Sequence, residues 1–220
     1  MMDHFVAISL LAVLDVLAYN YINPLRKIEH TRWCAIHAAA NVVVTTAALP
    51  SVIGAARHPE RCLTSGASRL PVTMGMWLHA YHVFLYELSA DDVMHHTVFV
   101  ALLGIPSYIW ARPATNVMLF SLSGAPGGLI YAFIALRRCG VACVGWDERY
   151  FSALVNAGLR LPGVLFATYC LIVAIVTQGA HGVPWIVLAI QVVLPLANAV
   201  YYTHQAVMRY SKARTGLARS

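Results

Sequence analysis

The sequence contains few charged residues. Only 11% of its 220 residues are Asp, Glu, Lys or Arg, whereas 60% are hydrophobic, and the mean hydropathy is +0.67. Soluble domains carry about 25% charged and about 45–50% apolar residues, so this chain lacks the polar side chains that a water-exposed surface requires. The composition excludes an ordinary soluble domain and predicts an all-α, polytopic transmembrane helical bundle with room for roughly six to eight crossings.

The sequence also has few cysteines, and they do not show the spacing of a metal site. Five are present, an odd number, and Cys139 and Cys143 are separated by three residues without a second pair. Zinc-binding sequences normally show two such pairs, so we interpret the cysteines as small apolar side chains. No repeat, linker or soluble segment is recognisable, and residues 1–220 are expected to form a single transmembrane domain.

Apolar runs separated by charge, glycine and proline predict seven spans, although six or eight would also fit. The first run lacks a positively charged start, so we expect an uncleaved first helix. It ends at Asn23-Pro24, because proline cannot continue a helix, and Pro50 is expected to kink or end the second. The spans lie near residues 5–22, 32–49, 71–88, 92–110, 114–136, 151–178 and 183–208.

Positive charge is unevenly distributed between the two ends of the predicted bundle. One end has Arg26, Lys27, Arg32, Arg137, Arg138, Arg149, Arg209, Lys212, Arg214 and Arg219, and the other has Arg57, Arg61, Arg69 and Arg112. Because cytosolic loops carry the excess of Lys and Arg, this predicts an N-terminus outside and a C-terminus in the cytosol. The net charge of +6 is then an orientation signal, and no nucleic-acid partner is expected.

Polar side chains inside apolar spans are costly and normally face the protein interior. Three consecutive predicted spans carry such groups at helical spacing, which places them on shared faces. They are His37, Asn41 and Thr45 in the second span, His79, His82, Tyr86 and Glu87 in the third, and Asp91, Asp92, His95 and His96 in the fourth. We predict an intramembrane polar cavity lined by His37, Asn41, His79, His82, Tyr86 and Glu87.

The two aspartates of the fourth span stand one turn before its two histidines, as the pairs Asp91–His95 and Asp92–His96. A carboxylate in that position accepts the imidazole N–H, fixes the tautomer and raises the basicity of the ring. The other ring nitrogen would then act as a general base or nucleophile. The alternative is that both aspartates cap the helix while the histidines lie at the membrane interface.

Gly124 and Gly128 have the small-xxx-small spacing that lets membrane helices approach closely. Pro126 between them is expected to break the helix, and broken helices in membranes line cavities or pack against neighbouring helices. We therefore include Ser123 and Pro126 among the candidate cavity residues, with tight helix packing as the alternative.

Two further groups lie in the last two spans. Arg160 is expected near the cytosolic end of its helix, where it would snorkel to the interface or meet an anionic head group. The seventh span carries a polar stripe that predicts interhelical hydrogen bonds. The stripe consists of Gln191, Asn198, Tyr202 and Gln205.

Histidine clusters at membrane depth also hold metals, as in di-iron lipid hydroxylases and desaturases with HxxxH and HxxHH boxes. This chain has only His79-x-x-His82 and His95-His96, with His37 and His204 as possible additions. Because a second HxxHH box is missing, we expect neither a metal nor a cofactor.

Several of these segments together resemble the TLC domain family, which includes ceramide synthases, translocation-associated membrane proteins and smaller lipid-handling proteins. The matching segments are Arg32-Trp33 with His37-Ala38, the acidic and double-histidine element at Asp91, Asp92 and His95-His96, and Ser121-Leu122-Ser123 ahead of Pro126. The resemblance covers roughly residues 5–210. It implies a helical bundle around a partly hydrophilic cavity that is open to lipid.

In the ceramide-synthase branch the paired histidines transfer an acyl group from acyl-CoA to a long-chain base. The resemblance would give this role to His95 and His96, with Asp91 or Asp92 as the orienting carboxylate. The family often has a glutamate where this chain has Ser121, and the short polar segments leave little protein outside the membrane to bind CoA. The chain is thus more similar to the smaller TLC proteins.

The sequence is compatible with three functions. The first is binding or handling of a membrane lipid in the polar cavity, without catalysis. The second is a non-catalytic accessory subunit that assembles with other membrane subunits. The third is acyl transfer with acyl-CoA as co-substrate. Family analogy predicts the endoplasmic reticulum, with the mitochondrial inner membrane or another organelle as the alternative.

Overall fold

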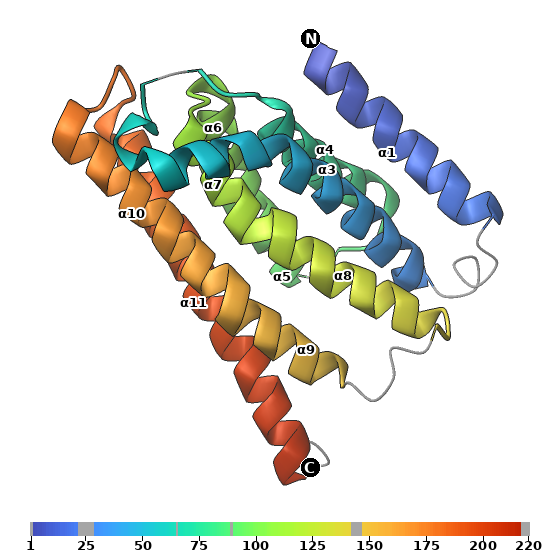
Figure 1. Cartoon of the computed structure of the whole chain (residues 1–220). Coiled ribbons are helices and arrows are strands. Elements are labelled where there is room, and N and C mark those ends of the chain that lie inside the picture. The colour runs from blue at the N-terminus through green and yellow to red at the C-terminus, as the bar shows by residue number, and fades with distance from the viewer. Residues whose placement is uncertain (1, 22–28, 65, 89, 142–146, 217–220) are drawn as a thin grey trace.

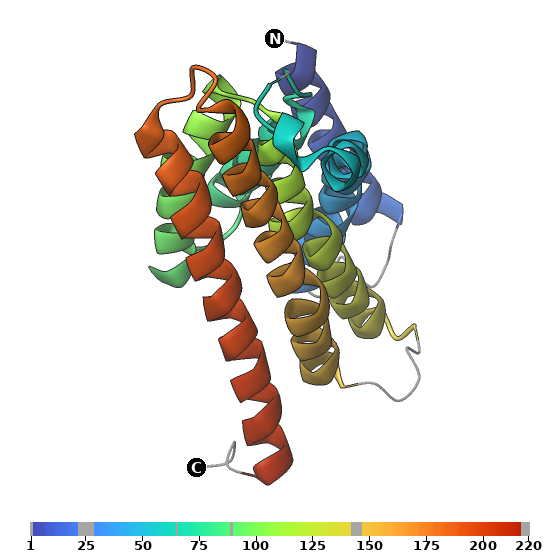
Figure 2. The ribbon, with the colours of Figure 1, turned by 60° about the vertical axis from the view of Figure 1, so that its left-hand side comes forward.

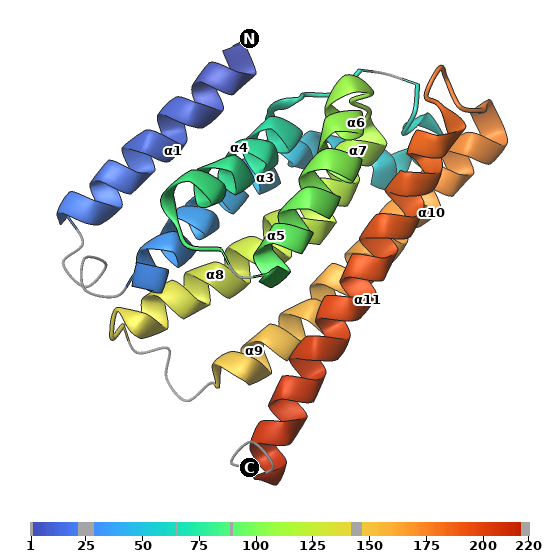
Figure 3. The ribbon, with the colours of Figure 1, turned by 180° about the vertical axis from the view of Figure 1, so that it is seen from behind.

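Helices form every regular element in the parts of the chain that the structure, a computed structural model, describes. These parts are residues 2–21, 29–64, 66–88, 90–141 and 147–216. The prediction of an all-α protein is confirmed. The helices run roughly along one direction, with α1 at one edge and α10 and α11 at the other (Figures 1 and 3).

The chain folds into helical rods, several of which change from α- to π-helix and back. The elements are α1 (Met2–Tyr21), α3 (Glu29–Arg57), α4 (Leu70–Leu85), α5 (Ala90–His96), α6 (Ile105–Ile109), α7 (Pro113–Leu119), α8 (Ala125–Arg138), α9 (Glu148–Val155), α10 (Leu161–Gln178) and α11 (Trp185–Thr215). The start of α1 and the end of α11 lie at opposite ends of the bundle. Helix α11 runs along the whole length of the bundle (Figure 2). In the centre, α3 packs against α1 and α4 and also against α7 and α8.

Five helices are long and apolar enough to cross a membrane. They are Met2–Asn20, Thr31–Arg57, Pro113–Arg138, Glu148–Gln178 and Trp185–Thr215. The protein is therefore compatible with an integral membrane protein, but the predicted count of about seven spans is not confirmed. The predicted spans 71–88 and 92–110 correspond to helices that are shorter than the five candidates. Helix α4 has 16 residues, and the other apolar helix covers Val93–Ile109. At 1.5 Å per residue α4 is about 24 Å long, less than the roughly 30 Å hydrocarbon core.

Prolines lie within these rods without ending them. The second helix was expected to end or kink at Pro50, but α3 continues to Arg57, so the predicted boundary at residue 49 is wrong. A helix in an apolar environment keeps its remaining backbone hydrogen bonds, because an unpaired amide is costly there. Proline therefore removes one bond and the helix continues beyond it.

Three rods contain a π-helical segment directly before a proline. The segments are Thr97–Gly104, Phe120–Gly124 and Asn156–Arg160, and the second residue after each is Pro106, Pro126 and Pro162. A proline ring clashes with the carbonyl four residues earlier, and the wider π turn makes room for it. The expectation that Pro126 breaks its helix is thus corrected to a change of helical winding.

Two apolar clusters hold the bundle together. One lies among α7, α10 and α11 and includes Val117, Val164, Leu171 and Leu188, and the other lies among α1, α3 and α4 and includes Leu11, Ile36, Met74 and Leu78. Cys34, Cys62 and Cys170 are buried free thiols. Contact with Cys170 and burial raise the pKa of the Cys62 thiol, which keeps it protonated and apolar.

Glycines allow α8 and the segment before it to approach α3 closely. Of the predicted pair, Gly124 makes such a contact and Gly128 makes an ordinary one, while Gly127 lies closest. A Cβ atom on Gly127 would lie 2.7 Å from Nδ2 of Asn41, and one on Gly124 would lie 3.0 Å from Oγ1 of Thr45. Both distances are tighter than ordinary van der Waals contact. The α3–α8 contact thus depends on residues without side chains.

We expect Gly127→Ala to lower the free energy of unfolding by about 1–3 kcal/mol, the usual effect of overpacking. The added methyl displaces the Asn41 amide, which is hydrogen-bonded to His37 at 2.9 Å. Thermal unfolding in detergent, followed by tryptophan fluorescence, measures the effect. Gly54→Ala is the control, because a Cβ on Gly54 of α3 meets nothing within 4 Å. Equal melting temperatures for the two variants would contradict the predicted contact.

Candidate functional site

Four histidines from two helices contact one another inside the bundle. The i, i+3 spacing places His79 and His82 on one face of α4, opposite His95 and His96 of α5. Nε2 of His79 lies 3.2 Å from Nε2 of His95, and Nδ1 of His82 lies 3.3 Å from Nε2 of His96. Each of these hydrogen bonds needs one protonated and one unprotonated nitrogen. Within each pair one ring therefore donates and the other accepts.

Aromatic rings extend this cluster into α3 and α8. The indole of Trp33 stacks on His82, with ring centroids 4.1 Å apart and planes inclined by 19°, and it also contacts His37 and Tyr86. His37 stacks on Tyr131 of α8 at 3.9 Å. The cluster therefore joins helices that are far apart in the sequence.

On its other side the cluster reaches α11 and the π-helical segment Asn156–Arg160. The hydroxyl of Tyr202 lies 3.4 Å from Nδ1 of His95, and the guanidinium carbon of Arg160 lies 5.6 Å from the centroid of the Tyr202 ring. We call the following residues the ring cluster: Trp33, His37, His79, His82, Tyr86, His95, His96, Tyr131 and Tyr202.

The structure brings together most of the predicted cavity residues. His37, His79, His82, Tyr86, His95 and His96 belong to the ring cluster, and Asn41 is hydrogen-bonded to it through His37. Glu87 is exposed, just beyond the end of α4. The side chains of Asp91 and Asp92 are outside the described residues, so the predicted aspartate–histidine pairs stay predictions.

Ser123 of the π-helical segment Phe120–Gly124 and Pro126 of α8 belong to the part of the chain that packs against α3. The Ser123 hydroxyl donates to the carbonyl of Leu119 at 3.3 Å, and Pro126 is buried at the start of α8. The predicted polar stripe of α11 does form an interhelical contact, because Gln191 donates to the hydroxyls of Ser107 and Thr115.

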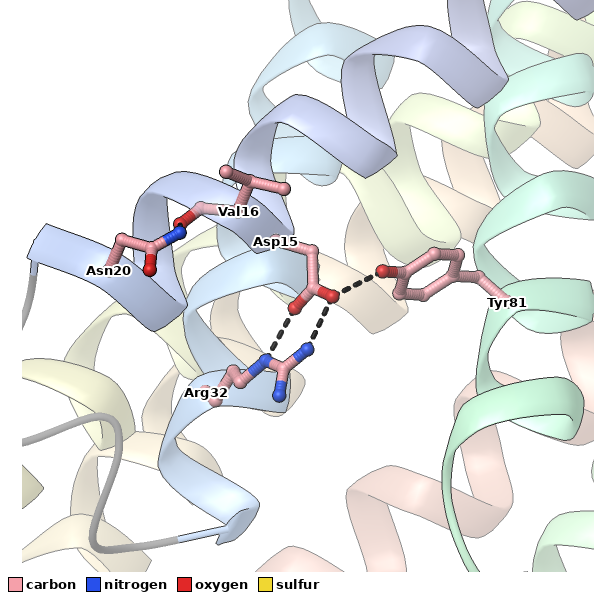
Figure 4. Close-up of polar contacts among 5 residues, drawn as sticks. All are labelled: Asp15, Val16, Asn20, Arg32 and Tyr81. Atoms are coloured by element: carbon pink, nitrogen blue, oxygen red, sulfur yellow. Dashed lines mark hydrogen bonds and ion pairs between the residues drawn. The ribbon is translucent and has the colours of Figure 1, made fainter.

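Sequence reasoning missed a polar contact at the first helix. Asp15 of α1 accepts two hydrogen bonds from the Arg32 guanidinium of α3 and one from the hydroxyl of Tyr81 of α4, at 2.5 Å (Figure 4). The Asp15 residue is only 8% exposed. An aspartate in the middle of an apolar run was a signal for a buried contact, but its partners lie 17 and 66 residues away in the sequence.

Histidine nitrogens of the ring cluster bond to each other in pairs and also to Asn41 and Tyr202. Among the side chains that the structure describes, no three His, Cys, Asp or Glu residues are arranged to hold a metal ion. A cavity of about 510 Å³ lies elsewhere, lined by residues that include Asp3, Arg69 and Arg112 and none of the ring cluster. Within the ring cluster His37, His79, His82 and His95 are partly exposed, whereas His96 is buried.

Comparison with known protein families, with curated proteins and with solved structures finds no match for this chain. The resemblance to the TLC family therefore stays a prediction.

Proposed function

We propose that this protein binds a membrane lipid at the ring cluster, as a TLC-like bundle that needs no catalysis for its role. The supporting observation is the half-burial of polar rings within apolar helices. His37, His79, His82 and His95 each retain exposed surface while their nitrogens form hydrogen bonds. Polar groups facing hydrocarbon are costly, and a lipid head group would cover them. The stacked rings would also offer an amphipathic surface to such a ligand.

Native mass spectrometry of the purified protein tests this proposal. We expect the wild-type protein to retain a lipid after purification in mild detergent. His82→Ala should lose most of it, because the change removes both the stacking with Trp33 and the bond to His96. His58→Ala is the control, since His58 is exposed and pairs with Glu60 outside the ring cluster. Lipid-free wild-type protein, or equal retention by both variants, would refute the binding role.

The same preparation tests the two alternatives from the sequence. Co-purification with other membrane proteins at fixed stoichiometry would support an accessory subunit. Turnover of acyl-CoA that is lost in His95→Ala would support acyl transfer. The contacts of His95 favour binding, because Nε2 faces His79 and Nδ1 faces Tyr202, so both nitrogens are engaged within the protein.

We also propose that the N-terminus faces outside and the C-terminus the cytosol, in the endoplasmic reticulum by family analogy. The start of α1 and the end of α11 lie at opposite ends of the bundle, which supports an odd number of crossings (Figure 1). The basic last turns of α8 and α11, with Arg137, Arg138, Lys212 and Arg214, fit the cytosolic side.

A further inference from the structure

Arg160 lies deep within its helical rod. The rod runs from Glu148 to Gln178, so Arg160 stands 12 residues from one end and 18 from the other. At 1.5 Å per residue these separations are about 18 and 27 Å. The guanidinium lies over the ring of Tyr202 on α11, and the expected snorkelling to the interface stays a prediction.

The Arg160 guanidinium has no ion-pair partner among the described side chains. The ion pairs present there are Asp15–Arg32, His58–Glu60 and Arg61–Glu60. The guanidinium faces the ring of Tyr202, with 5.6 Å between its central carbon and the ring centroid. Its Nε atom is buried and has no hydrogen-bond partner there. Arginine stays charged in proteins, so the charge persists.

A second unsatisfied atom lies one turn earlier in the same π-helical segment. The side-chain amide of Asn156 donates to the carbonyl of Ser152 at 2.7 Å, but its Oδ1 atom is buried without a partner in the described part of the chain. A donor and an acceptor, four residues apart in one helical segment, are therefore left unsatisfied. Buried groups of this kind are normally paired with protein, water or a ligand.

We propose that the lipid bound at the ring cluster carries a phosphate-bearing anionic head group that pairs with Arg160; this inference rests on the proposed function. A guanidinium at membrane depth needs a counter-ion, and its planar N–H fork matches the oxygens of a phosphate. Tyr202 contacts both Arg160 and His95, so a phosphate here would lie beside the histidines.

Lipid binding by the full-length protein in detergent tests this inference. The shift in melting temperature is measured with phosphatidylglycerol, with phosphatidylcholine of the same acyl chains, and with inorganic phosphate. We expect phosphatidylglycerol to stabilise wild type more than phosphatidylcholine does. Arg160→Gln should weaken phosphatidylglycerol binding by about ten- to a hundredfold, the usual loss of a charged hydrogen bond, and leave phosphatidylcholine binding unchanged. Arg160→Lys should retain part of the preference.

Arg149→Gln is the matched control, because Arg149 is exposed on the same rod. Without lipid, Arg160→Gln should melt at or above the temperature of wild type, since it removes an unpaired charge. A lower melting temperature would show that Arg160 is satisfied within the protein and would overturn the inference.

The remaining outcomes separate this inference from the proposed function. Equal binding of the two lipids by wild type, or an unchanged preference in Arg160→Gln, overturns the anionic head group and leaves lipid binding standing. Absence of any lipid binding overturns both. Stabilisation of wild type by inorganic phosphate, lost in Arg160→Gln and not increased by phosphatidylglycerol, would assign the site to a free anion and overturn the lipid.

Discussion

Asp15→Asn is expected to lower the free energy of unfolding by about 3 kcal/mol, near the lower end of the range for breaking a buried ion pair. The change leaves the Arg32 guanidinium without its carboxylate and weakens the bond from Tyr81. The lower end applies because the Arg32 side chain keeps 27% of its surface exposed. Since Asp15 joins α1 to both α3 and α4, detachment of the first helix should be the first unfolding step.

Thermal unfolding and limited proteolysis of α1 in detergent measure this effect. Asp3→Asn is the control on the same helix, because Asp3 forms no ion pair with any residue that the structure describes. The double variant with Arg32→Gln should recover part of the lost stability, since it removes the unpaired charge. Wild-type stability of Asp15→Asn would show that the contact does not hold α1 in place.

Gly163→Leu is expected to destabilise the protein by at least about 3 kcal/mol, because overpacking by smaller groups already costs about 1–3 kcal/mol. A Cβ on Gly163 of α10 would lie 2.9 Å from Cβ and 3.0 Å from Oγ of Ser121. Ser121 is buried and its hydroxyl donates to the carbonyl of Val117 at 2.9 Å, so it cannot turn away. The two rods would have to separate.

Gly158→Leu on the same rod is the matched control. Gly158 is exposed, and a Cβ there meets nothing within 4 Å. This variant should keep the wild-type melting temperature, with Gly163→Ala lying between the two leucine variants. Equal melting temperatures for Gly158→Leu and Gly163→Leu would contradict the close approach of α10 to Ser121.

The same contact limits the size of the side chain at position 121, because Ser121 faces Gly163 at close range. A glutamate would need space that α10 occupies. The close approach of α10 to position 121 therefore requires both the small side chain of Ser121 and the glycine at position 163.

Composition and hydropathy determined the helical class and the positions of the helices, because an apolar environment demands that every backbone group be paired within its own helix. Helical spacing also grouped the histidines correctly, since residues three and four apart share a face whatever surrounds them. It predicted His79 with His82 on one face and His95 beside His96. The second helix does not end at Pro50, because the requirement for paired backbone groups outweighs the one hydrogen bond that proline removes.

Only the tertiary structure decided which faces meet. The partners of Asp15, the stacking of Tyr131 on His37 and the turn of Arg160 toward Tyr202 join residues from different helices. Periodicity places a side chain on its own helix but carries no information about the rotation and neighbours of that helix. Those depend on close packing, here on glycines such as Gly127 and Gly163, which allow their helices to approach.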